Sequence, residues 1–98
     1  MRLTLPFLLL ALLPGPADAQ AHDRAARIRA AVARGEVLPL SRILALARAR
    51  VPGEMLGVEL EKENGRLAYE VEILTGNGRV REVTLDARTG RVLAVEGD

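Results

Sequence analysis

One stretch, residues 66–75, constrains the fold of this 98-residue chain more than any other. Apolar side chains occupy every second position, and the positions between them carry alanine or glutamate. Such alternation is typical of a β-strand with one buried face. Turn-forming residues flank the stretch, Asn64-Gly65 before it and Gly76-Asn77-Gly78 after it. The pattern therefore predicts a central strand of an antiparallel sheet, with a neighbouring strand on each side.

The neighbouring strands follow from the lengths of these turns. A two-residue Asn-Gly turn before the central strand, the strongest short hairpin signal, sets Leu60 opposite Tyr69. A three-residue loop after it sets Val71 opposite Val83, whereas a two-residue loop would place the apolar faces out of phase. Arg81 then takes an inward position near the end of the sheet, where its stem can lie on apolar surface.

A fourth strand follows a turn at residues 86–91. A four-residue loop predicts that Val92 and Ala94 face inward, and that Leu93 and Val95 face outward. A three-residue loop would reverse these orientations, and we prefer the four-residue form. Side chains that hydrogen-bond the backbone, and a glycine able to adopt positive φ, are expected to shape the turn. These structural residues are Asp86, Thr89 and Gly90.

Two helices are predicted before the sheet. Residues 22–34 carry a thin apolar stripe, and residues 40–51 place a broader apolar face on one side. Pro39 suits the start of the second helix, and Pro52-Gly53 ends it. The expected fold is therefore α+β with two layers, in which one or two N-terminal helices pack on a four-stranded antiparallel meander of strand order 1-2-3-4.

The N-terminus has the pattern of a secretory signal peptide. A basic residue precedes a mostly apolar run at residues 3–13, and small residues suit cleavage after Ala19 or Ala21. An N-terminal anchor is the alternative, but the run is about half the roughly 20 residues that a span requires. We expect a periplasmic or secreted protein without a stable membrane span in its mature form. The predicted segments are 1–19 (signal peptide), 20–37 (basic helical lead-in) and 38–98 (folded domain).

The composition excludes several functions. The absence of cysteine removes disulfides, thiolate catalysis and cysteine-based zinc sites. Two aromatic residues and a net charge of +1 argue against nucleic-acid binding. His22 is the single histidine and lies in the predicted tail, so no zinc or catalytic cluster forms around it. We expect no cofactor, no resident metal and no catalytic residue.

Charge is divided unevenly along the chain. Residues 22–50 hold seven arginines against two acidic residues, whereas residues 51–98 hold six basic and ten acidic residues. The acidic side chains alternate outward on the predicted strands, which favours a solvated sheet face over a calcium or acid–base site. The split either stabilises the two layers or provides two electrostatic docking faces. The candidate residues for these faces are Arg24, Arg27, Arg34, Glu59, Glu70, Glu72 and Glu82.

Outward apolar residues provide a second kind of candidate surface. Exposed apolar side chains grouped on a sheet can mark a partner surface. The last strand is also a free edge with few charges, so strand addition or a homodimer through it is conceivable. The candidate partner-surface residues are Leu74, Val80, Leu93 and Val95.

Four segments together resemble the PepSY domain family over residues 38–96. They are 51–53, 58–60, 69–71 and 86–92. The resemblance implies a helix on an antiparallel sheet, in a secreted or periplasmic protein. It also implies a link to propeptides of thermolysin-like metallopeptidases. No peptidase follows within these residues, so we expect a non-enzymatic module that binds, and can modulate, an envelope protein such as a peptidase. The alternative is an accessory or sensory subunit that reports to a membrane protein or an envelope signalling system.

Overall fold

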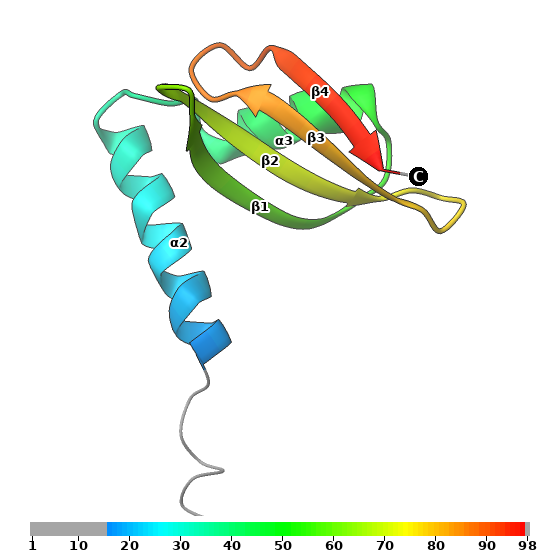
Figure 1. Ribbon diagram of the computed structural model, residues 1–98, viewed down its shortest axis with the longest axis horizontal. Coiled ribbons are helices and arrows are strands. Elements are labelled where there is room, and N and C mark those ends of the chain that lie inside the picture. Colours follow the sequence, from blue (N-terminus) through cyan, green and yellow to red (C-terminus); the bar gives the residue numbers. More distant parts are fainter. Residues whose placement is uncertain (1–15, 98) are drawn as a thin grey trace, which may run out of the picture.

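The computed structural model describes residues 16–97 of the chain. Two helices precede four strands, which form one antiparallel sheet of order β1-β2-β3-β4. Helix α3 covers one face of this sheet, and helix α2 lies at its β1 edge (Figure 1). This arrangement confirms the predicted α+β meander. The elements are α2 (Pro16–Ala33), α3 (Leu40–Arg50), β1 (Glu54–Glu63), β2 (Arg66–Leu74), β3 (Val80–Asp86) and β4 (Val92–Gly97).

Helix α2 is longer than the sequence pattern indicated. It begins at Pro16 rather than at His22, and proline is well suited to a first helical position. The greater part of the predicted signal peptide, residues 1–15, lies outside the described residues. The two predicted cleavage positions, Ala19 and Ala21, lie within α2.

Helix α3 ends where the sequence predicted. Val51 follows its last residue in an extended conformation, because the proline after it disfavours helical geometry. Gly53 then adopts a φ of +155°, which brings the chain close to β2. A Cβ atom at this position would overlap the carbonyl oxygen of Leu74 and the side chain of Ile73. Glycine is therefore required for the turn from α3 into β1.

The register of the first three strands is the predicted one. Leu60 lies opposite Tyr69, and Val71 lies opposite Val83. Both hairpins therefore direct their large apolar side chains to the same face. Strand β1 begins at Glu54, and the pairing shifts near this end of the strand.

The predicted orientation of β4 was correct for Val92 and Leu93 and wrong for Ala94 and Val95. Ala94 lies on the solvent side and Val95 packs against the core, the reverse of the expectation. A β-bulge around Leu93 inserts one residue and changes the phase of the strand. The bulge allows Val92 and Val95, instead of a valine and an alanine, to cover the core. The observed pairs are Val83 with Val95, Thr84 with Ala94 and Leu85 with Val92.

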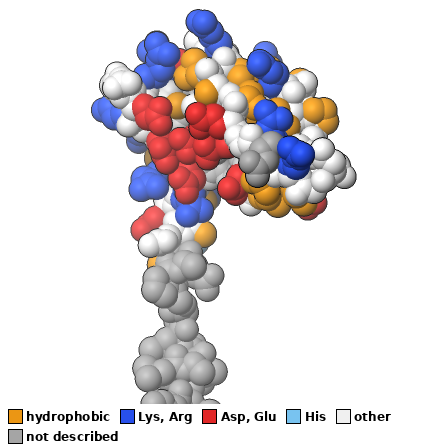
Figure 2. Space-filling view, turned by 45° about the vertical axis from the view of Figure 1, so that its right-hand side comes forward, with side chains coloured by type: hydrophobic (Ala, Val, Ile, Leu, Met, Phe, Trp, Pro, Cys, Tyr) orange, Lys and Arg blue, Asp and Glu red, His pale blue; other side chains and the backbone are white. Residues whose placement is uncertain are grey.

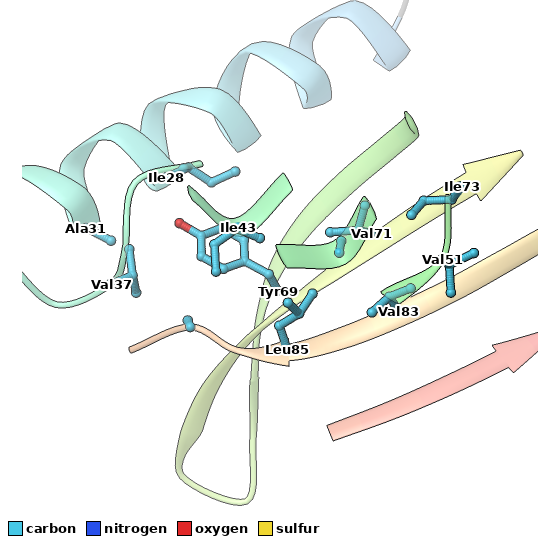
Figure 3. Packing of buried hydrophobic residues seen from close by; sticks show 12 residues of the cluster. Ile28, Ala31, Val37, Ile43, Val51, Tyr69, Val71, Ile73, Val83 and Leu85 are labelled. Carbon is cyan, nitrogen blue, oxygen red and sulfur yellow. The ribbon is translucent and has the colours of Figure 1, made fainter. Parts of the chain in front are cut away.

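The core lies between α3 and the inner face of the sheet (Figure 3). Each large apolar side chain buried there contributes about 1.5–3 kcal/mol from removal of its surface from water. Helix α2 adds Ile28 and Ala31 to this cluster from the side of the sheet. The fully buried members from α3 and the strands are Ile43, Ala47, Tyr69, Val71, Ile73, Val83 and Leu85.

Two polar side chains occupy inner-face positions. The hydroxyl of Tyr69 donates a hydrogen bond to the carbonyl oxygen of Leu38 over 3.1 Å, and this bond satisfies the only polar atom of a ring that is fully buried. Arg81 lies opposite Ile73 as predicted. Its Nε is buried and has no hydrogen-bond partner within the described part of the chain.

Candidate functional site

The solvent face of the sheet carries a concentration of carboxylates (Figure 2). Strand pairing places Glu59 directly opposite Glu70, and Glu82 between Glu72 and Glu96. Like charges at directly opposed positions of a sheet destabilise it. The predicted acidic residues of the sheet therefore lie on one surface, which we call the acidic face: Glu59, Glu61, Glu70, Glu72 and Glu82.

Three members of the acidic face are close enough to share a ligand. One carboxylate oxygen each from Glu59, Glu61 and Glu70 lies within 4.8 Å of the others. Calcium takes about 6–8 oxygen ligands, so three side chains on an open face supply only part of a coordination shell. The chemistry of this cluster is that of a negative surface that attracts cations, including the basic side chains of another protein.

Two carboxyl groups of the acidic face have raised pKa values. The pKa of Glu70 is raised to about 7, first by burial and then by the charges of Glu61, Glu82, Glu63 and Glu59. The carboxyl of Glu70 is therefore partly protonated near neutral pH. The pKa of Glu61 is also raised, first by its side-chain hydrogen bond with Glu59.

Two of the three candidate arginines, Arg24 and Arg27 of α2, lie beside the acidic face. The Nε of Arg24 is 4.0 Å from a carboxylate oxygen of Glu59. Arg27 joins Arg24 in lining a hollow of about 320 Å³ next to Glu59 and Glu61. Arg34 instead pairs with Glu36 in the following turn, over 2.9 Å. The predicted basic face is thus split, and only its N-terminal part meets the sheet.

The candidate apolar surface is also divided. Leu74 and Val80 are paired on the solvent side at one end of the sheet, and Val80 is 43% exposed. Leu93 is 38% exposed and lines a hollow beside Asn64, at the other end. Val95 does not belong to this surface, because the bulge in β4 turns it toward the core.

The sequence pattern left one exposed apolar residue unpredicted. Leu56 is 49% exposed and sits at a register shift between Met55 and Gly57. A signal for it existed, because Met55 and Leu56 are consecutive apolar residues that break the alternation of β1. Broken alternation next to a glycine indicates a β-bulge.

The turn between β3 and β4 is held by its own side chains. The backbone N–H groups of Arg88 and Thr89 donate to Asp86 Oδ1 over 2.9 and 3.0 Å. These two hydrogen bonds lower the pKa of the Asp86 carboxyl, and the bond from Thr89 has the larger effect. Arg66 Nε lies 3.6 Å from the same carboxylate, and Gly90 has a φ of +81°. All of these contacts stabilise the turn itself.

The fold and the site define a small two-layer α+β domain whose most distinctive surface is acidic. Residues 37–96 match the model of the PepSY family, described as the peptidase propeptide and YPEB domain. The match covers more than half of the chain, and the chain therefore belongs to the PepSY family. Searches of curated proteins and of solved structures returned no match.

Domains of this family are non-catalytic modules of the propeptide or inhibitor type. They are typically extracellular or periplasmic. Within residues 16–97, neither helix has the length and apolar character needed to cross a membrane.

Proposed function

We propose that this chain is an exported, non-enzymatic PepSY module that binds an envelope protein, such as a peptidase, and modulates its activity. The acidic face is its docking surface, and the partner presents basic side chains to it. Membership of a family of propeptide-type and inhibitor-type modules supports the general role.

The observation that carries the choice of surface is the crowding of carboxylates. Glu59 faces Glu70 across one pair of strands, and Glu72 faces Glu82 across the next. Arg24 makes the only ion pair with this face among the described residues. Folding gains nothing from opposed like charges, whereas a basic partner would neutralise them on binding.

Site-specific crosslinking in the cell envelope tests this proposal first. A photoreactive amino acid replaces Glu72, whose side chain is exposed at the centre of the acidic face. The matched control replaces Arg42, which is exposed on the far side of the molecule, on α3. We expect a protein adduct from the first position and not from the second. Equal adducts from both positions would contradict the choice of face.

Binding of the captured partner to the purified domain provides the second test. A variant combining Glu70→Gln, Glu72→Gln and Glu82→Gln should bind at least about tenfold more weakly. The affinity of the unsubstituted domain should fall as salt is added. The Glu54→Gln variant, changed outside the acidic face, should bind normally. If the partner is a peptidase, its hydrolysis of a peptide substrate is measured with and without the domain. The proposal would be contradicted if the partner bound equally well at high salt and to the triple variant.

A further inference from the structure

An apolar groove separates helix α2 from the β1 edge of the sheet. Its volume is about 660 Å³, within the ~300–1,000 Å³ that ligand sites occupy. Figure 3 shows one of its lining residues, Ile28, directed from α2 toward the body of the domain. The main apolar lining residues are Ala25, Ile28, Val32, Leu40, Met55 and Val58.

One wall of this groove is a free strand edge. Strand β1 has β2 on one side and no strand on its other side within residues 16–97. Glu63 and Arg66 flank the two-residue turn and form a hydrogen-bonded pair. Along an antiparallel ladder, hydrogen-bonded pairs alternate with pairs whose main-chain groups point away from the partner strand. Val58 and Leu60 belong to the second kind of pair, so their main-chain N–H and C=O groups point away from β2. Val58 therefore offers unpaired main-chain groups at the groove.

The rim of the groove is positively charged. Arg24 and Arg29, both from α2, line it together with the apolar residues. Arg24 is engaged with Glu59 over 4.0 Å. Arg29 is exposed, and no carboxylate of the described residues forms an ion pair with it. A ligand that fits the groove would gain by carrying a carboxylate near Arg29.

We propose that the groove binds an extended peptide segment of another protein by strand addition to β1. The main chain of the segment pairs with the free edge at Val58. Its alternate side chains are apolar and enter the groove, and one acidic residue lies against Arg29. An acyl chain would also fit an apolar groove, but it would leave the edge of β1 unpaired. The groove and the acidic face are different surfaces that meet at Arg24, which lines the groove and pairs with Glu59.

A designed peptide tests the inference and does not require the natural partner. The probe is a short fluorescein-labelled peptide of alternating valine and threonine with one central aspartate. We expect saturable binding in fluorescence anisotropy, about tenfold tighter than for the same peptide with lysine in place of aspartate. A peptide N-methylated at the alternate positions that face β1 cannot donate main-chain hydrogen bonds to the strand edge and should not bind.

Hydrogen exchange locates the bound peptide at the edge. The amide of Val58 should become protected when the peptide binds. The amide of Glu59 should not change, because it already points toward β2 in the register of the sheet.

A charge reversal in the groove completes the test. Arg29→Glu should invert the preference, so that the lysine peptide binds more tightly than the aspartate peptide. Arg42→Glu, on the exposed side of α3 and outside the groove, should leave the preference unchanged. Both are surface substitutions, and circular dichroism verifies that each variant is folded. Absence of binding, equal binding of all peptides, or displacement of the probe by a fatty acid without protection at Val58 would overturn the inference.

Discussion

The inner and outer faces of the sheet are built from the same strands but have opposite physical properties. On β2, Tyr69 and Val71 are fully buried under α3, whereas their neighbours Glu70 and Glu72 belong to the acidic face. One face is apolar and closely packed, and the other collects negative charge that folding does not require. The residues that hold the fold together can therefore be separated by mutation from those proposed to bind a partner.

The largest expected effect comes from reversing this division at one position. Val71→Asp places a carboxylate at a fully buried position of the apolar core. We expect a loss of about 4 kcal/mol or more in the free energy of unfolding, enough to unfold a marginally stable domain. The neighbouring Glu72→Gln should change stability by less than ~0.5 kcal/mol. Thermal unfolding followed by circular dichroism measures both changes. A native-like transition in Val71→Asp would contradict the division between a buried inner face and a solvent-exposed outer face.

A smaller loss is expected where the chain passes from the helical layer to the sheet. Gly53→Ala introduces a Cβ that overlaps β2 at a φ of +155°, so we expect a loss of roughly 2–3 kcal/mol. Gly76→Ala is the matched control, because that glycine has open space around it and no positive φ. Chemical denaturation of the two variants measures the difference in their free energies of unfolding. Equal stability would show that the junction tolerates a side chain.

The polar contact of the inner face should have a still smaller effect. Tyr69→Phe keeps the packing of the ring but removes the hydrogen bond to the carbonyl oxygen of Leu38. The expected loss is about 1 kcal/mol, as for one intramolecular hydrogen bond. Denaturant titration measures it, and an unchanged midpoint would mean that water replaces the hydroxyl at no cost.

The last prediction concerns the outer face, where the expected effect has the opposite sign. Glu70 has a pKa of about 7 in the folded protein, above its ordinary value of 4.5. The folded state therefore binds this proton more tightly, and stability falls as pH rises from 4.5 through about 7. Glu70→Gln should be more stable than the unsubstituted domain above pH 7, with the difference disappearing below pH 4.5. Thermal unfolding across this pH range checks the sign.

Glu54→Gln is the control for that experiment. Glu54 also lies on β1 but is not among the groups that shift the pKa of Glu70. Its substitution should not reproduce the pH dependence. If it did, the raised pKa of Glu70 would not be the cause.

The candidate site could be predicted from the sequence only where regular alternation held. The positions of Glu59, Glu70, Glu72 and Glu82 followed from period-two patterns and short turns. The exposure of Leu56 was missed because a bulge shifts the phase of a strand by one residue. Alternation counted along the chain locates such a shift only where the pattern is visibly broken, as it is at Met55 and Leu56.

The sequence by itself determined the family, the strand order and which residues of β2 and β3 face the core. These depend on local signals, since turn residues and alternating side chains act over a few neighbouring positions. Only the tertiary structure decided the inward turn of Val95, the raised pKa of Glu70 and the groove beside α2. Each of these depends on distant segments brought together, where burial and charge are set by neighbours in space and not along the chain.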